Sequence, residues 1–374
     1  MKSDIICFSH LRWGFVYQRP QHLLSRFARQ GRVFFFEEPT YHDDGPRYDV
    51  NRDPESGVNI VVGRLPHGTT PEEADRLQQV FLDDLIRKQQ IHDYVAWYYT
   101  PMMLGFSSHL QPKAIVYDCM DELSAFKGAP PEMREREAEL FRRAALVFTG
   151  GQSLYEAKRT QHPDVHAFPS SVDVAHFAQA RAGLNDPADQ ASIAPPRIGY
   201  CGVIDERMDL ALIDAVAERR PDWQLIMLGP VVKIDPATLP RRPNIHWLGG
   251  KQYAELPAYL SGWEAAMLPF ARNESTRFIS PTKTPEYLAA GLPAVSTSIR
   301  DVVRPYGERQ LVQIADTPDE FVIAMERALS QRWNAAWQQK VDEFLGGNSW
   351  DSTQERMANL ILSKKETTAE QAVA

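Results

Sequence analysis

The sequence predicts an α/β protein with two tandem domains, each a parallel sheet covered by helices. Three observations support this prediction. The chain has 374 residues, too many for one ordinary hydrophobic core and enough for about two to three domains. Hydrophobic residues make up 43% and charged residues 24%, which is typical of globular proteins. Short apolar runs alternate with helical patterns, and the alternation breaks once and then restarts.

The first half alternates strands and helices as a parallel sheet requires. Short β-type runs predict strands at residues 5–9, 32–36, 59–62, 94–98, 114–117, 146–149 and 165–168. Apolar residues at helical spacing predict helices at residues 20–30, 71–91, 131–143 and 154–160. Gly31 is placed to end the first of these helices.

The alternation stops at residues 178–196, which are rich in Ala, Gly, Asn, Asp and Pro and predict a linker or loop. Strands are then predicted at residues 197–203, 224–228, 244–248, 265–268 and 294–296. Helices are predicted at residues 210–218, 254–259, 285–290, 317–329, 333–345 and 350–363.

These patterns divide the chain into four parts. We expect an N-terminal domain (1–177), a linker (178–196), a C-terminal domain (197–346) and a last helix with its tail (347–374). Ligands bind such sheets beyond the carboxyl ends of the strands, so we expect the site in a cleft between the two domains.

Charge and cysteine content exclude several function classes. Lys and Arg number 41 against 49 Asp and Glu, and a net charge of -8 argues against general nucleic-acid binding. The three cysteines, Cys7, Cys119 and Cys201, lie far apart in apolar runs, so we expect small buried side chains and no disulfide or zinc framework. The N-terminus lacks a signal-peptide pattern, and no apolar stretch is long enough to span a bilayer. We expect a cytoplasmic protein.

The most informative segment is residues 280–293, SPTKTPEYLAAGLP. Thr284 suits a helix N-cap and the proline after it suits the first helical position. Backbone N–H groups at a helix start attract a phosphate, and Lys283 adds a full positive charge. Glu286 lies in the first turn, where acids are common for structural reasons; alternatively it accepts hydrogen bonds from a ribose diol.

A second segment, residues 199–207 (GYCGVIDER), ends a strand at a glycine and continues to Arg207. Glycine allows close backbone approach to a ligand, and arginine can hold a phosphate through two hydrogen bonds. A solvated arginine in an ordinary turn is the stronger interpretation when this segment is taken alone.

The loop after the first strand, residues 10–22, is dense in histidine, arginine and aromatic residues. Its alternative interpretations are a ligand-binding loop and a connection pinned by burial of its tryptophan, with the binding role slightly favoured. The candidates for acceptor or sugar binding are His10, Arg12, Trp13, Arg19 and His22.

Acidic residues follow a strand at residues 116–122, VYDCMDE. Asp118 and Asp121 could position or deprotonate an acceptor hydroxyl, or one of them could cap the next segment. The two interpretations are about equal. No matching ligand set elsewhere in the sequence indicates a metal site.

Several common catalytic motifs are absent. The sequence contains no G-x-x-x-x-G-K-[ST], no G-x-G-x-x-G after the first strand, no G-x-S-x-G and no H-E-x-x-H. A nucleotide triphosphatase, a common dehydrogenase, a typical α/β-hydrolase and a zinc protease are therefore disfavoured.

Five segments, in this order and spacing, resemble motifs of one enzyme family. Residues 170–177 (SSVDVAHF) resemble N-G-V-D-x-x-x-F, 244–249 (NIHWLG) resemble V-x-F-L-G and 268–270 (LPF) resemble L-P-S. Residues 286–295 (EYLAAGLPAV) are similar to E-A-x-A-x-G-x-P-V-V, and 348–350 (NSW) to F-S-W. This pattern resembles the GT-B-fold glycosyltransferases of family 4, and it covers nearly the whole chain. The resemblance implies two Rossmann-like domains and a C-terminal helix that crosses back to the first domain.

The resemblance also implies roles for residues. Glu286 matches the residue that contacts the donor ribose, while Arg207 and Lys283 are the candidates, by analogy, for holding the leaving phosphate. Asp118 and Asp121 are the other catalytic candidates and would contact the acceptor or the donor sugar. The remaining donor-binding candidates are Ser280, Thr282, Thr284, Gly202, Gly229, Gly249 and Tyr253. The family's first glutamate of E-x7-E is replaced here by Phe278, so the resemblance does not identify the donor sugar.

The runs QRPQH and SPTKTPE resemble those of bacterial cell-wall and exopolysaccharide transferases, including teichuronic-acid synthesis proteins. The resemblance implies transfer of a sugar from a nucleotide-diphosphate donor to a saccharide or lipid-linked acceptor, with retained configuration, no metal and no other cofactor. The alternatives are a sugar-nucleotide epimerase of the same fold and a non-catalytic scaffold. Residues 133–143 mix charge signs, so at most weak peripheral contact with a membrane is expected.

Overall fold

The chain folds into two compact units. The computed structural model describes residues 3–373, and it describes side-chain surroundings for residues 3–364. One unit combines Met1–Pro169 with Asp351–Ala374, and the other is Ser170–Trp350. Each unit contains one mainly parallel sheet, so the predicted α/β class is confirmed.

The sheet of the first unit has the order β3-β5-β2-β1-β6-β7-β8-β9, with β4 paired to β5. Its strands are β1 (Asp4–Phe8), β2 (Val33–Phe36), β3 (Thr40–Tyr41), β4 (Arg47–Arg52), β5 (Asn59–Leu65), β6 (Tyr94–Tyr98), β7 (Ala114–Cys119), β8 (Leu146–Thr149) and β9 (Val165–Ala167). Only β4 runs antiparallel to its neighbour. Strands β2, β6 and β8 are buried along their whole length, as expected when helices cover both faces of a parallel sheet.

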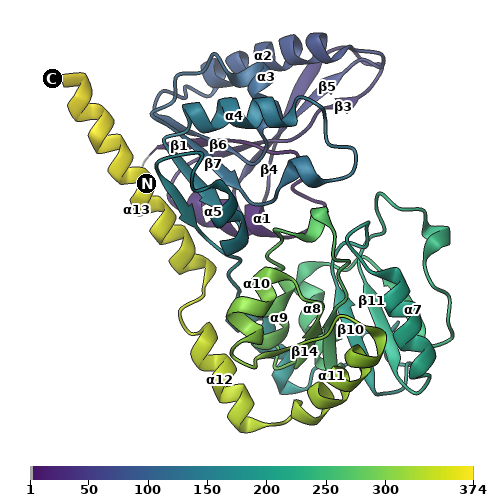
Figure 1. Cartoon of the computed structure of the whole chain (residues 1–374). Helices are drawn as coiled ribbons and strands as arrows, with labels where there is room; N and C mark the ends of the chain where they lie inside the picture. Colours follow the sequence, from purple (N-terminus) through teal and green to yellow (C-terminus); the bar gives the residue numbers. More distant parts are fainter. Residues whose placement is uncertain (1–2, 374) are drawn as a thin grey trace. The chain divides into compact units, whose positions relative to one another are not determined.

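Helices lie on both faces of this sheet. They are α1 (Arg19–Ala28), α2 (Pro71–Lys88), α3 (Leu104–Ser107), α4 (Met133–Arg143), α5 (Gln152–Lys158) and α13 (Trp350–Val373), with the 3₁₀ turns η1 (Pro101–Met103) and η2 (Leu123–Ala125). Figure 1 shows α2, α3 and α4 together over one face, with α1 on the other.

The C-terminal helix α13 is part of the first unit, which confirms the predicted return of the chain. Asp351 forms ion pairs with Arg26 at 3.0 Å and with Arg29 at 3.4 Å. Met357 and Ile361 are fully buried on the inner side of α13. Figure 1 shows this helix running along the first unit.

The sheet of the second unit is wholly parallel and has the order β12-β11-β10-β13-β14-β15. Its strands are β10 (Arg197–Cys201), β11 (Gln224–Leu228), β12 (Ile245–Gly249), β13 (Ala265–Leu268), β14 (Ala294–Ser296) and β15 (Val312–Ile314). The chain moves outward in one direction from β10 and in the other from β13, so the strand order reverses between these two strands.

The helices of the second unit fall into two packed groups. They are α6 (Val174–Ala178), α7 (Leu210–Arg219), α8 (Leu256–Ser261), α9 (Lys283–Ala289), α10 (Arg300–Val302), α11 (Pro318–Gln331) and α12 (Ala335–Leu345), with the short turns η3 (Gln179–Ala182), η4 (Pro236–Thr238), η5 (Tyr253–Glu255), η6 (Glu274–Thr276) and η7 (Val303–Gly307). Helix α7 packs against α11, whereas α6 and α12 both contact α9. Right-handed connections in opposite directions place α7 and α9 on opposite faces.

Some elements differ from the sequence-based expectation. Strand β4 was not predicted because its sequence, RYDVNR, is polar and its side chains are mostly exposed. Residues 178–196 pack onto the second unit: Gln190 is buried, accepts a hydrogen bond from the Trp263 indole at 2.8 Å and donates to the Tyr259 carbonyl at 3.0 Å. Asp186 pairs with Arg197 at 2.7 Å.

Candidate functional site

Two loops diverge where the strand order of the second sheet reverses. Residues 202–209 follow β10, and residues 269–282 follow β13 and lead into α9. Such a divergence leaves a crevice at the carboxyl ends of the strands, where doubly wound sheets bind ligands. Arg207 comes from the first loop, while Lys283 and Glu286 lie at the start of α9. The structure thus gathers the principal donor-site candidates around one reversal point.

Glycine backbones line the neighbouring strand ends. The N–H of Gly202 donates to the Leu228 carbonyl at 2.9 Å, and the N–H of Gly229 donates to the Gly249 carbonyl at 2.9 Å. Gly229 has a φ of +146°, and a Cβ atom there would lie 1.7 Å from the Gly202 carbonyl oxygen. No other residue fits at this position, so a ligand here would meet backbone groups.

We expect Gly229→Ala to lower the free energy of unfolding by about 2–3 kcal/mol, because the methyl group must displace backbone that has no room to move. Gly250→Ala is a matched control, since its Cβ would lie 3.8 Å from Pro230, an ordinary contact. Denaturant unfolding of both variants measures the difference. Equal stability of the two variants would contradict the close approach.

Lys283 and Glu286 form a partly buried ion pair at the start of α9. The Lys283 Nζ lies 2.6 Å from the Glu286 Oε2, and the Glu286 side chain is 3% exposed. Burial alone would lower the pKa of Lys283, but the Glu286 carboxylate beside it raises that pKa above its ordinary value, so the ammonium is held charged. Burial raises the pKa of Glu286, while Lys283 offsets part of this effect.

Helix α9 is tied to the end of β10. The backbone N–H of Cys201 donates to the Tyr287 hydroxyl at 2.7 Å, and Tyr287 is fully buried. Cys201, like Cys7 and Cys119, is a buried free thiol, as predicted. Because of this link, the position of the Lys283–Glu286 pair is set by the same strand that carries the glycine turn.

The prediction that Thr284 caps this helix is wrong. The helix begins at Lys283, and Thr282 occupies the capping position with helical backbone angles and without a side-chain cap. The turn starts early because the N–H of Thr284 donates to the Pro281 carbonyl at 3.1 Å. Thr284 is instead fully buried, and the Ser280 carbonyl accepts a hydrogen bond from Ser170 at 3.2 Å.

Arg207 is held by its neighbour Asp205. The guanidinium Nε lies 3.0 and 3.1 Å from the two carboxylate oxygens, and Nη2 lies 2.7 Å from Oδ2. Asp205 is buried, whereas the Arg207 side chain is 26% exposed. The pair fixes the orientation of the guanidinium and offsets part of its charge. The Lys283 side chain is 16% exposed, so Lys283 is the better buried of the two predicted phosphate cations.

His176 and Tyr253 form an aromatic stack that feels the charge of Lys283. The rings of His176 and Tyr253 lie 4.3 Å apart at an angle of 10°, and the His176 Nε2 lies 3.0 Å from the Tyr253 carbonyl. Burial lowers the pKa of His176, and the charge of Lys283 lowers it further. Tyr253 was predicted from its segment. His176 was not predicted as a site residue, although it lies in the SSVDVAHF stretch that carried part of the family resemblance.

In the first unit, the loop after β1 is pinned to the sheet. Trp13 is buried, and its backbone N–H donates to the Glu37 Oε1 at 2.6 Å. The centroid of its ring lies 5.1 Å from that of Phe35 in an edge-on arrangement. Arg12 pairs with Glu37 at 3.2 Å and donates to the Pro39 carbonyl at 3.1 Å. These contacts match the structural alternative for this loop, in which burial of the tryptophan holds the connection. His10, at the start of the loop, is half-buried.

Arg19 and Asp118 form a buried ion pair. Nη2 of Arg19 lies 2.8 Å from Oδ1 of Asp118, Nε lies 3.0 Å from Oδ2, and Nη1 donates to the Phe168 carbonyl at 2.7 Å. Asp118 is 0% exposed and Arg19 is 3% exposed. Both groups have their charge satisfied inside the protein, which favours a structural role over contact with an acceptor.

Other candidates of the first unit differ in exposure. His22 is buried in α1, where its ring packs edge-on against Tyr17 at 4.7 Å. Asp121 is half-buried in the loop after β7. The most accessible apolar side chains of the β1 loop are Phe15, 51% exposed, and Tyr17, 37% exposed. These two aromatic residues were not singled out from the sequence, although their segment was.

Comparison with known families decides the class of the second unit. Residues 195–331 match the family model described as glycosyl transferases group 1. This segment of the second unit is similar to the group 1 glycosyl transferases. The matched range includes every strand of the second sheet and the Arg207, Lys283 and Glu286 positions. The protein is accordingly a glycosyltransferase, as the sequence motifs indicated.

A curated relative agrees with this class. The glycosyltransferase is 24% identical over 278 residues to TuaH of Bacillus subtilis (strain 168), named as a teichuronic acid biosynthesis glycosyltransferase, and the match covers 68% of each chain.

Solved structures show the GT-B fold over almost the whole chain. Sucrose-phosphate synthase from Thermosynechococcus elongatus is similar with a TM-score of 0.72, 15% identity, and coverage of 98% of this chain and 100% of that one. A trehalose-6-phosphate structure from E. coli with bound UDP-2-fluoro glucose has a TM-score of 0.69, 12% identity, and coverage of 96% and 99%. Anabaena Alr3699/HepE, in complex with UDP and glucose, has a TM-score of 0.66, 13% identity, and the same coverage. The predicted fold is therefore confirmed.

Two features are absent from the part of the chain that the structure describes. No helix in this part of the chain has the length and apolarity to cross a membrane. No group of three or more His, Cys, Asp or Glu side chains with the arrangement of a metal site occurs among the same residues.

Proposed function

We propose that the glycosyltransferase uses a nucleoside-diphosphate sugar bound to the second unit and transfers the sugar to a saccharide or lipid-linked acceptor bound to the first. The reaction would serve synthesis of a bacterial surface polysaccharide, in line with the name of the TuaH relative. Retention of configuration and independence from metal are part of the proposal and rest on the family resemblance.

The observation that carries the proposal is the partly buried Lys283–Glu286 pair beside the glycine-lined strand ends. A leaving nucleoside diphosphate develops negative charge, and a fixed ammonium in a buried site stabilises that charge more than it would in water. Lys283 is such a group, because Glu286 keeps it charged and Tyr287 anchors its helix. Arg207 would supply a second, more exposed cation.

Glu286 has a carboxylate oxygen that can accept hydrogen bonds from a ribose diol. One oxygen, Oε2, is 2.6 Å from Lys283, which orients the carboxylate. At Gly229 and Gly249 the nucleotide base could approach backbone groups closely. Tyr253 would lie at the edge of the base. Ser280, Thr282 and Gly202 would complete the donor site.

If Glu286 contacts the ribose, the enzyme should bind UDP or another preferred ribonucleotide more tightly than the matching 2′-deoxynucleotide. We expect Glu286→Gln to reduce this preference by roughly tenfold, because a neutral amide accepts a weaker hydrogen bond than a carboxylate. Calorimetric titration of both proteins with both nucleotides provides the comparison. An unchanged preference in the variant would remove Glu286 from the ribose contact.

Release of nucleoside diphosphate from a sugar donor, with and without acceptor, tests the proposed reaction. A transferase should release the nucleotide much faster when a saccharide acceptor is present, and a new glycosidic product should appear by mass spectrometry. Conversion of the donor to its epimer without acceptor would indicate the epimerase alternative instead. A protein that binds none of UDP, GDP and dTDP would indicate a scaffold.

A further inference from the structure

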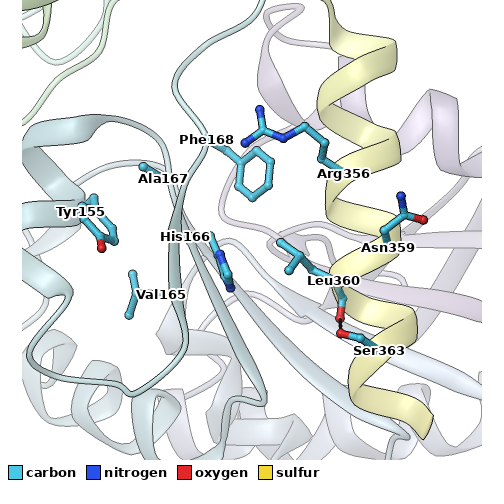
Figure 2. A pocket seen from close by; sticks show the side chains of 9 residues that line it. All are labelled: Tyr155, Val165, His166, Ala167, Phe168, Arg356, Asn359, Leu360 and Ser363. Atoms are coloured by element: carbon cyan, nitrogen blue, oxygen red, sulfur yellow. Dashed lines mark hydrogen bonds between the residues drawn. The ribbon is translucent and has the colours of Figure 1, made fainter.

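The first unit contains a cavity outside the proposed donor site. Its volume is about 620 Å³, within the range of about 300–1,000 Å³ that is typical of ligand pockets. It lies between β9, α5 and α13, and all of its lining residues belong to the first unit. Figure 2 shows β9 on one side and α13 on the other, with Phe168 and Leu360 between them.

One wall carries a cation that forms no ion pair within the part of the chain that the structure describes. Arg356 extends from α13 over Phe168, with its guanidinium carbon 4.9 Å from the ring centroid (Figure 2). Among the described residues, no ion pair of Arg356 occurs. The nearby Asp164 is already paired, because it accepts from His166 at 2.5 Å and from Lys364. The positive charge of Arg356 is therefore available to a ligand.

The opposite wall offers polar backbone groups. Within residues 3–373, strand β9 is the edge of its sheet and pairs only with β8. Alternate backbone N–H and C=O groups of an edge strand point away from the sheet and lack strand partners. The Asp164 carbonyl accepts from the Val147 N–H at 3.1 Å and the Phe168 N–H donates to the Thr149 carbonyl at 2.9 Å, so the backbone groups of Asp164 and Phe168 face β8. Val165 and Ala167, which line the cavity, alternate with these residues and direct their backbone groups to the open edge. A ligand rich in hydroxyl groups would satisfy these backbone groups.

Aromatic and amide side chains complete the lining. Phe168, His166 and Tyr155 present flat ring surfaces, and Asn359 brings an amide from the turn of α13 that follows Arg356. Sugar rings bind proteins through this combination, since their C–H faces lie on aromatic rings while their hydroxyl groups form hydrogen bonds. Arginine adds selectivity for carboxylate or phosphate, because its planar fork matches their oxygens.

We infer that this cavity binds a saccharide that carries an acidic group, with Arg356 as the residue that recognises the charge. The ligand class is an acidic glycan, either a uronate or a sugar phosphate. Such a site would hold a growing or completed acidic chain on the first unit while the reaction takes place elsewhere. The inference is independent of the donor site and does not require the proposed reaction.

Ligand-observed saturation-transfer NMR on the full chain tests the site with glucuronate, glucose 6-phosphate and neutral glucose. We expect at least one acidic sugar to bind with a millimolar or lower Kd and glucose to bind more weakly. Arg356→Gln should weaken acidic-sugar binding by roughly tenfold, the size expected for loss of a charge-assisted contact. The two acidic probes distinguish a carboxylate ligand from a phosphate ligand.

Arg309→Gln is the matched control, since Arg309 is an exposed arginine stacked on Phe344 at 5.4 Å in the second unit. Thermal unfolding should show that both variants remain folded. Saturating nucleoside diphosphate should leave the acidic-sugar signal in place, which separates this site from the donor site. The inference is overturned if neither acidic sugar binds, if glucose binds equally well, or if Arg356→Gln and Arg309→Gln bind alike.

Discussion

Replacement of Lys283 by alanine should lower kcat by roughly 100-fold or more, the size seen when a preorganised charge-stabilising group is removed from an active site. The reason is that Lys283 is the better buried cation of the proposed phosphate site, and its charge is maintained by Glu286. Turnover with the natural donor, once identified by titration, is the measurement.

Two further variants make this result interpretable. Lys340→Ala removes an exposed lysine from α12 in the same unit and should leave turnover unchanged. Lys283→Arg keeps a positive charge and should retain more activity than Lys283→Ala. Full activity of folded Lys283→Ala would exclude the residue from leaving-group stabilisation. A loss of activity that tracks a fall in melting temperature would instead indicate that the ion pair stabilises the fold.

Replacement of Asp118 by asparagine should destabilise the first unit by about 3–5 kcal/mol, because it leaves the Arg19 charge buried without a counter-ion. The side chains of the pair are 4% and 0% exposed, so water cannot compensate. The double variant Arg19→Met with Asp118→Leu should recover much of the loss, since it removes both charges. Calorimetric unfolding of the full chain measures these effects.

An exposed ion pair provides the control for Asp118. Asp351 is 64% exposed and pairs with Arg26 and Arg29, so Asp351→Asn should change stability by less than about 1 kcal/mol. If Asp118→Asn keeps its stability but loses activity, the carboxylate takes part in catalysis. This result would support the sequence-based interpretation in which Asp118 positions or deprotonates an acceptor hydroxyl.

Elements with strong local patterns were predictable. The buried strands of both sheets come from runs such as VFFF and AAML, which no surface element would tolerate. Strand β4 escaped prediction because its polar sequence becomes a strand only through pairing with β5. The predicted start of α9 was two residues too late, because the Pro281 carbonyl, and not a threonine side chain, accepts the first hydrogen bond of the turn.

The sequence predicted which residues belong to the candidate site but not which side chains contact one another there. The motif around Glu286 placed Lys283 and Glu286 together at a helix start, where the structure pairs them, because this pattern depends on contiguous residues. Partners far apart in the sequence were not visible: Asp118 meets Arg19 across 99 residues, and Tyr253 meets His176 across 77. The sequence shows which residues carry a charge, whereas the oppositely charged partner of each one depends on tertiary contacts.

The most direct test of the proposed donor site is a calorimetric titration of the full chain with UDP, GDP and dTDP, repeated on Lys283→Ala and Lys340→Ala. We expect one nucleotide to bind the native chain and Lys340→Ala equally and to bind Lys283→Ala at least tenfold more weakly, in keeping with the loss of a charge-assisted phosphate contact. Absence of binding by all three nucleotides, or equal affinity in Lys283→Ala, would contradict a nucleoside-diphosphate site at the start of α9.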